Sequence, residues 1–271
     1  MNDRVEYMVR GWGYTAHCLN PFRRTIPIRG LPLGLKLRAY KRDAVGRGLY
    51  RRRIHEPALT NLLLSRFAGS AERNFLDIGA NIGYFSCLMG KLAGPSGKVF
   101  AVEPELHNLD LLNQNLELNA IENVIVHGCA LGAKAGSARL GLYKPSNRGR
   151  HTLVDAESRT SIEVHVRTLD EIVGASGLQE ATWALMKMDV EGYEGYVLQG
   201  GKETLPRVEM LVMEFSPEFL RKAGLEPADI LDSLSRIFKR VCRIDGTHVI
   251  PTSIDKCFKQ KDQIELVFDR E

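Results

Sequence analysis

The sequence has 271 residues, of which 44% are hydrophobic and 26% are charged, a composition that suits one large globular domain with a substantial buried core. It has no apolar run near the roughly 18 residues that a membrane-spanning helix requires, and its first residues lack the apolar segment of a secretory signal. Five scattered cysteines without a Cys-x-x-Cys pair indicate neither a disulfide framework nor a zinc site, so we expect a cytoplasmic protein with reduced thiols.

The first 55 residues differ in charge from the rest of the chain. They contain 13 Lys or Arg and 3 Asp or Glu, a net charge of +10, whereas the remainder carries −6. Pro27, Gly30 and Pro32 interrupt any regular period, so we expect residues 1–55 to form a basic, irregular extension. Such a segment could contact an acidic surface or the substrate, although most charge runs of this length are simply solvated. We expect a chain that starts near Arg53 to keep its cofactor site.

Residues 56–271 alternate apolar runs of strand length with segments of helical period. The expected strands cover 75–78, 99–102, 124–126, 184–188, 210–213, 241–244 and 264–268, and the expected helices cover 57–67, 84–92, 106–118, 193–205 and parts of 217–237. Repeated strand–helix–strand units predict a parallel sheet, and the last two strands, with no long helix between them, predict an antiparallel pair. The predicted fold is α/β and Rossmann-like, with seven mostly parallel strands and helices on both faces.

Residues 128–170 break this rhythm. Two strands are expected there, over 138–143 and 162–166, beside a polar loop that holds Arg148, Arg150 and His151. We expect an insertion next to the sheet, with His151 in a loop that could close over a substrate.

A glycine turn joins the first expected strand to its helix. Asp77-Ile78-Gly79-Ala80-Asn81-Ile82-Gly83 places a carboxylate at the strand end and lets the backbone approach a ligand closely. A dinucleotide fingerprint that starts at Gly79 would need glycine at positions 81 and 84, where this chain has Asn81 and Tyr84. The spacing therefore disfavours NAD and favours a nucleoside sulfonium, S-adenosylmethionine, with Asn81 in the left-handed conformation.

Glu103 is the second element of this predicted cofactor site. It follows the strand at 99–102, and a carboxylate at the tip of the second strand is placed to accept hydrogen bonds from both ribose hydroxyls. The combination of the Asp77 turn with Glu103 indicates S-adenosylmethionine more strongly than the turn alone.

At this point the sequence resembles the FkbM family of methyltransferases, from about His55 to the C-terminus. The resemblance rests on the motifs Asp77–Phe85, Val102-Glu103-Pro104, Ala130-Leu131-Gly132, Thr168-Leu169-Asp170-Glu171 and Met186–Gly192. It implies a class I methyltransferase fold and transfer of a methyl group to a hydroxyl of a saccharide, glycolipid or related metabolite. The cofactor site that it implies consists of Asp77, Gly79, Asn81, Gly83, Tyr84, Phe85, Glu103, Pro104 and Ala130.

Methyl transfer to a hydroxyl is an in-line displacement that depends on alignment and on a base that takes the proton. Asp189 and Glu191 end the strand at 184–188, and Glu214 ends the strand at 210–213, at the edge where open α/β sheets bind ligands. Glu191 could instead cap the helix that follows. We expect Asp189 to be the base, with Glu191, Glu214 and His151 as the other candidates.

Three carboxylates on one rim could also bind a metal ion. A divalent-ion enzyme of the catechol type would show an Asp-Asn pair at the end of the 210–213 strand, where this chain has Glu214-Phe215. We therefore expect no metal at the site.

The expected partner is a small-molecule or glycan acceptor. The alternative is a nucleic-acid-directed methyltransferase that uses the basic N-terminal segment. No RNA-binding module is recognisable, and Asp189-Val190-Glu191-Gly192 occupies the place of an Asn-Pro-Pro-Tyr-type tetrad, so nucleic acid is disfavoured. A catalytically silent binding module is least favoured, because Asp77 and Glu103 are both present.

Overall fold

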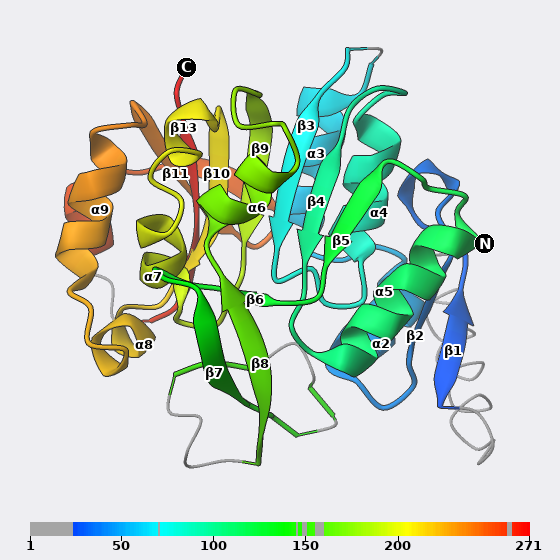
Figure 1. Cartoon of the computed structure of the whole chain (residues 1–271). Helices are drawn as coiled ribbons and strands as arrows, with labels where there is room; N and C mark the ends of the chain where they lie inside the picture. Colours follow the sequence, from blue (N-terminus) through cyan, green and yellow to red (C-terminus); the bar gives the residue numbers. More distant parts are fainter. Residues whose placement is uncertain (1–23, 70, 145, 148–150, 155–159, 259–261) are drawn as a thin grey trace.

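The computed structural model describes residues 24–69, 71–144, 146–147, 151–154, 160–258 and 262–271, and its centre is an eight-stranded sheet (Figure 1). The strand order is β12-β11-β13-β10-β9-β3-β4-β5. The bounds are β3 Asn74–Ile78, β4 Val99–Val102, β5 Val124–His127, β9 Trp183–Met188, β10 Met210–Phe215, β11 Arg240–Asp245, β12 His248–Pro251 and β13 Ile264–Asp269.

The sheet is parallel from β10 to β5 and antiparallel at its C-terminal side. β3 pairs in parallel with both β4 and β9, and β9 pairs in parallel with β10. β13 lies antiparallel between β10 and β11. The predicted α/β fold with a mostly parallel sheet is confirmed, and so is the antiparallel C-terminal pair.

The predicted count of seven strands was one too low. All seven predicted strands are present, and the eighth is β12, which pairs antiparallel with β11. Asp245 and His248 face each other across a two-residue turn that begins with Gly246 at φ 61°. A glycine with positive φ matches the twist of a tight hairpin, so a short, mostly exposed strand with little apolar period can still pair there.

Helices cover both faces of the sheet, as predicted. They are α2 Ala44–Arg52, α3 Pro57–Phe67, α4 Tyr84–Leu92, α5 Leu106–Leu118, α6 Leu169–Ala175, α7 Glu194–Gln199, α8 Pro217–Lys222, α9 Pro227–Ser235 and α10 Ile254–Phe258. Because side chains alternate along a strand, Phe75 packs into the core beneath α3, α4 and α5, while its neighbour Leu76 packs into a second core beneath α6, α7 and α9.

The N-terminal segment is regular where the structure describes it, which corrects the predicted irregular extension. Residues 24–55 form an antiparallel hairpin of β1 Thr25–Ile28 and β2 Leu37–Tyr40, followed by α2, beside α5 (Figure 1). Ile26, Ile28 and Leu37 are buried in the same core as α4. Pro27 is tolerated because β1 is an edge strand. A chain starting near Arg53 would lose this part of the core, so we no longer expect it to keep the cofactor site.

The predicted insertion forms a separate three-stranded sheet. It consists of β6 Ala130–Leu131, β7 Gly136–Gly141 and β8 Ser161–Arg167, and it lies below the central sheet in Figure 1. Both predicted strands of this region are present. Arg148 and Arg150 of the predicted loop lie outside the described residues.

Within the described part of the chain, no helix combines the length and the apolar character that a membrane span needs.

Candidate active site

The turn between β3 and α4 is held in a left-handed path. Gly79, Asn81 and Gly83 have φ values of 81°, 50° and 82°. A Cβ atom on Gly79 would collide with the carbonyl oxygen of Asp189, so the turn can lie against the end of β9 only with glycine at this position. Asn81 adopts the conformation that the sequence predicted.

Every backbone N–H of residues 79–83 already has a partner inside the protein. Gly79 and Ala80 both donate to the Val102 carbonyl at 2.9 Å, and Gly83 donates to the Ala80 carbonyl at 2.9 Å. The Asn81 N–H donates to Glu103 Oε2 and the Ile82 N–H to Asn81 Oδ1, each at 2.8 Å. A phosphate cradle needs free N–H groups, so this turn is unsuited to a dinucleotide pyrophosphate.

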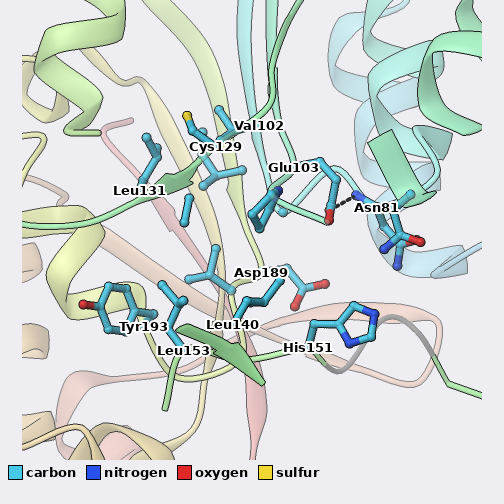
Figure 2. Close-up of a pocket in the computed structure, with 16 residues that line it drawn as sticks. Asn81, Val102, Glu103, Cys129, Leu131, Leu140, His151, Leu153, Asp189 and Tyr193 are labelled. Atoms are coloured by element: carbon cyan, nitrogen blue, oxygen red, sulfur yellow. Dashed lines mark hydrogen bonds between the residues drawn. The ribbon is translucent and has the colours of Figure 1, made fainter. Parts of the chain in front are cut away.

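Glu103 is 5% exposed and lies at the end of β4 against this turn (Figure 2). Its Oε1 accepts from the Glu105 N–H at 2.9 Å, while its Oε2 accepts from Asn81. The Asn108 side chain also hydrogen-bonds this carboxylate, which leaves about one of its four lone-pair sites for a ligand. Burial raises the pKa of Glu103 to about 7, against the lowering effect of the backbone hydrogen bonds.

A first cavity of about 620 Å³ opens in front of Glu103. Figure 2 shows its mixed lining, in which Glu103, Asn81, Asp189 and His151 are polar and several apolar side chains lie around them. Leu140 and Leu153 come from the insertion, and Tyr193 comes from the segment before α7. The insertion therefore forms one wall of the cavity beside the cofactor turn.

A second, smaller cavity of about 330 Å³ lies on the other side of the same turn. Gly79, Asn81 and Asp189 line it as well as the first cavity, and Asp77 and Lys187 add buried charges. The Asp77 carboxylate is fully buried, and its Oδ2 accepts from the Ser86 hydroxyl at 2.5 Å. Among the described residues, no hydrogen-bond partner lies at Asp77 Oδ1.

Lys187 stands between Asp77 and Asp189. It is 5% exposed, its Nζ lies 3.3 Å from Asp189 Oδ2, and it lies 5.2 Å from the centroid of the Phe85 ring. Burial alone would lower the pKa of the Lys187 ammonium, but Asp189, Glu56 and Asp77 raise it above its ordinary value. Lys187 therefore carries a positive charge at neutral pH and cannot serve as a base.

A third cavity of about 800 Å³ lies beyond Lys187, over the ends of β9, β10 and β13. Its charged lining consists of Glu56, Lys187, Asp189, Glu214 and Glu265. Glu214 and Glu265 are direct cross-strand partners of β10 and β13, where like charges disfavour pairing.

The two paired glutamates have strongly perturbed ionisation. Burial, with Asp189 and other carboxylates nearby, raises the pKa of Glu214 to about 10. Burial, with Glu56 nearby, raises the pKa of Glu265 to about 8. Both glutamates therefore hold a proton at neutral pH, which removes the repulsion between like charges on the two paired strands.

Glu56 reaches the third cavity from the start of α3, with its backbone in the left-handed region at φ 40°. Burial would raise the pKa of Glu56, but His55, whose Nε2 lies 3.1 Å from Glu56 Oε1, and Lys187 lower it. The N-terminal side of the chain thus contributes a carboxylate to a site that otherwise belongs to the sheet.

The structure brings three of the four predicted catalytic residues together. Oxygen atoms of Asp189, Glu191 and Glu214 lie within 4.8 Å of one another, a spacing at which one divalent cation could contact all three. The expectation of a metal-free site therefore remains a prediction. His151 lies apart from Glu191 and Glu214, in the first cavity, where its Nδ1 accepts from the Tyr143 N–H at 2.9 Å.

Two predicted site residues lie away from all three cavities. Glu191 lines none of them, and whether it caps α7 remains a prediction. Gly83 also lines none of them, and a side chain there would press on Leu112 of α5. The remaining predicted cofactor residues line the first or the second cavity, namely Asp77, Gly79, Asn81, Tyr84, Phe85, Glu103, Pro104 and Ala130.

Glu56, Lys187 and Glu265 were missed by the sequence reasoning. Lys187 had a usable signal, because it is the one charged residue in the wholly buried strand Trp183–Met188. A buried cation needs a partner, which points to the carboxylates around it. Glu265 offered no such signal, because only the pairing of β13 with β10 brings it opposite Glu214.

The comparisons with known proteins agree with this geometry. The methyltransferase FkbM domain matches residues 77–240. The hexuronic acid methyltransferase AglP of Haloferax volcanii is 28% identical over 159 residues, which are 59% of this chain and 60% of AglP. Methyltransferase 1 of Beauveria bassiana is 31% identical over 146 residues, which are 46% of this chain and 57% of that protein. The chain thus spans less than two thirds of the length of these relatives.

Two further proteins are similar to this chain, one over a shorter segment and one at lower identity. The 2-O-methyltransferase NoeI of Sinorhizobium fredii is 38% identical over 73 residues, which are 27% of this chain and 29% of NoeI. A crystal structure of a methyltransferase FkbM from Methylobacillus flagellatus is similar at a TM-score of 0.48 and 20% identity, over 81% of this chain and 49% of that one.

Proposed function

The chain belongs to the methyltransferase FkbM family, and on this premise we propose that it transfers a methyl group from S-adenosylmethionine to a hydroxyl of a saccharide, glycolipid or related hydroxylated metabolite. The observation that carries this proposal is the position of Asp189. It borders the first, second and third cavities at once. The Asp189 carboxylate thus borders two cavities that suit a nucleoside with an amino-acid tail and a third cavity that suits a methyl acceptor.

The first two cavities fit S-adenosylmethionine. Glu103 has a lone pair for a ribose hydroxyl, and Leu140 and Leu153 offer an apolar wall for the base. Asp77, with a buried oxygen that has no partner among the described residues, fits the cationic end of the amino-acid tail. When bound, this cofactor supplies an activated methyl group on a sulfonium.

Asp189 takes the acceptor proton in the proposed reaction. Lys187 Nζ contacts Asp189 Oδ2, which leaves Oδ1 to accept the hydroxyl hydrogen. The cofactor would supply the methyl group to the acceptor oxygen, and Asp189 would take the hydroxyl proton as that oxygen is methylated. Lys187 remains protonated throughout and keeps the Asp189 carboxylate oriented at the end of β9.

The third cavity supports a hydroxylated acceptor. Carboxyl groups hydrogen-bond hydroxyl groups in both protonation states, and four of them line this cavity around the Lys187 ammonium group. The names of AglP and NoeI, a hexuronic acid methyltransferase and a 2-O-methyltransferase, also favour a sugar. Because four carboxyl groups line the cavity, and the one ammonium group among its described lining residues already contacts Asp189, we propose a neutral sugar over a uronate.

The same lining disfavours the alternative of a nucleic-acid acceptor. A polyanion gains affinity from Lys and Arg at its phosphates, whereas the acceptor side here offers Glu56, Asp189, Glu214 and Glu265. Among residues 24–55, which the structure describes, no basic side chain lines this cavity.

Mass spectrometry of glycans and metabolites tests this proposal. Cells with the gene, without the gene, and with the gene encoding Asp189→Asn are compared for products that lose one CH₂ increment. We expect the loss on a neutral sugar hydroxyl, both in the deletion strain and in the Asp189→Asn strain. A lost methyl group on RNA would favour the alternative function instead, and one on a uronate would remove the preference for neutral acceptors.

A further inference from the structure

Two asparagines of α5 hold the backbone of the N-terminal hairpin. The Lys36 N–H donates to Asn119 Oδ1 at 2.9 Å, and Asn119 Nδ2 donates to the Lys36 carbonyl at 2.6 Å. The Arg38 N–H donates to Asn115 Oδ1 at 2.7 Å, and Asn115 Nδ2 donates to the Arg38 carbonyl at 3.0 Å. Asn115 and Asn119 are one helical turn apart, so their amides pair with alternate residues along one edge of the hairpin, as a neighbouring strand would.

The two asparagines differ in their remaining hydrogen bond. Asn119 Nδ2 also donates to the Asn115 carbonyl at 2.7 Å, within its own helix. Asn115 Nδ2 also donates to the Ile82 carbonyl at 2.8 Å, in the turn that joins β3 to α4. Asn115 is fully buried, so its amide is a direct link between the hairpin and the turn.

The Ile82 carbonyl depends on this contact. Ile82 precedes Gly83, the residue that caps α4, and the Cys87 N–H donates to the Gly83 carbonyl at the first turn of the helix. The Ile82 carbonyl is therefore outside the helical hydrogen-bond ladder, and Asn115 supplies its donor. Because Asn81 and Ile82 are consecutive, this bond restrains the same segment that holds Glu103 in place.

A second connection runs from the N-terminal side to this turn. Thr60 of α3 donates to the His55 carbonyl at 2.6 Å, and its hydroxyl lies 3.1 Å from the Tyr84 hydroxyl. His55 and Val45 line the second cavity together with Ile82 and Tyr84. The N-terminal segment is thus in contact with the turn both through α5 and directly at the cavity.

We infer that Asn115 is a positioning residue for the cofactor turn, and that through it the affinity for the cofactor depends on the N-terminal hairpin. The inference rests on the proposed use of S-adenosylmethionine. By linkage, a ligand that stabilises the turn also stabilises the contact between Asn115 and Arg38.

The test compares Asn115→Asp with Asn119→Asp in the full-length protein. Each change keeps the acceptor oxygen and removes two donated hydrogen bonds, so Asn119→Asp is the matched control. Melting temperatures are measured without ligand and with saturating S-adenosylhomocysteine, and the dissociation constant is measured by calorimetry. We expect both variants to melt earlier, and only Asn115→Asp to bind S-adenosylhomocysteine about 5- to 30-fold more weakly with a smaller ligand-induced rise in melting temperature.

Hydrogen exchange in the unaltered protein gives a second test that needs no variant to fold. Saturating S-adenosylhomocysteine should slow exchange of the Arg38 amide, which is bonded to Asn115, more than exchange of the Lys36 amide, which is bonded to Asn119. Equal affinity in the two variants, or equal protection of the two amides, would overturn the inference. Failure of the unaltered chain to bind S-adenosylhomocysteine at all would overturn the proposed cofactor and this inference together.

Discussion

The two sides of Asp189 recognise ligands in different ways. On the side of the first cavity, the turn at 79–83 has every amide engaged within the protein, and Glu103 is the one carboxylate besides Asp189 among the described residues of a pocket with mixed polar and apolar lining. On the side of the third cavity, carboxyl groups from the start of α3, β10 and β13 surround the ammonium group of Lys187, the one basic side chain in the lining among the described residues. The first side is a rigid backbone frame that suits an invariant cofactor, and the second is a set of side chains from distant segments that can differ between acceptors.

The largest expected effect comes from replacing Asp189, the residue that borders both sides, and it should fall on turnover and not on cofactor affinity. Asp189→Asn keeps the shape of the side chain and removes the proposed base, so turnover should fall by about 10²–10⁴-fold while the affinity for S-adenosylmethionine changes little. Transfer of radiolabelled methyl groups and calorimetry measure the two quantities. Glu191→Gln is the control, because Glu191 is nearby but lines none of the cavities, and it should retain turnover.

Parallel loss of cofactor affinity and turnover in Asp189→Asn would assign Asp189 to the cofactor side. Full activity would transfer the role of base to Glu191, Glu214 or His151.

Removing the positive charge of Lys187, which lies between the two sides, should lower the free energy of unfolding. Lys187→Met leaves Asp77, Asp189 and Glu56 without their buried cation, so we expect a loss of about 3–5 kcal/mol in the free energy of unfolding. Lys187→Arg keeps the positive charge and should therefore retain most of this free energy of unfolding. Urea titration at neutral pH measures both variants. Equal stability of Lys187→Met and the unaltered protein would mean that these carboxylates bind protons instead of relying on Lys187.

The cofactor side should respond to pH through Glu103. With its pKa raised to about 7, Glu103 is ionised above that pH and protonated below it. If the ribose requires the ionised form, affinity for S-adenosylhomocysteine should be constant above about pH 7 and fall by up to about tenfold per pH unit below it. Glu103→Gln should weaken binding by roughly 1–3 kcal/mol and remove this pH dependence. Calorimetry from pH 5 to pH 9 would contradict the assignment if both proteins gave the same pH profile.

The smallest expected effect concerns the acceptor side. Because burial and Glu56 raise the pKa of Glu265 to about 8, the folded protein holds this proton after the unfolded chain has lost it, and stability falls as pH rises toward 8. Glu265→Gln cannot ionise, so its stability should fall less than that of the unaltered protein between pH 5 and pH 8, with an advantage of at least about 1 kcal/mol above pH 8. Thermal unfolding at both pH values measures this, and a larger gain at pH 5 would contradict it.

The main elements could be predicted because their signals are local. Pro57 begins a helix that ends at Phe67, and Tyr84–Leu92 and Leu106–Leu118 form helices with the predicted bounds. The two predicted strands of the insertion could likewise be recognised from the local sequence pattern. The N-terminal hairpin was missed because Pro27 and the charge excess suggested irregular structure, whereas Ile26, Ile28 and Leu37 gain their stability from a core that lies elsewhere in the chain.

The sequence by itself determined the cofactor turn, the Glu103 position and the family, because these depend on residue types at short, fixed spacings. Only the tertiary structure decided that Glu56, Lys187 and Glu265 meet Asp189, that His151 lies in the first cavity and that Asn115 joins the hairpin to the turn. The physical reason is that strand pairing and helix packing bring together residues far apart in the chain, and no local pattern encodes which long-range pairs will meet.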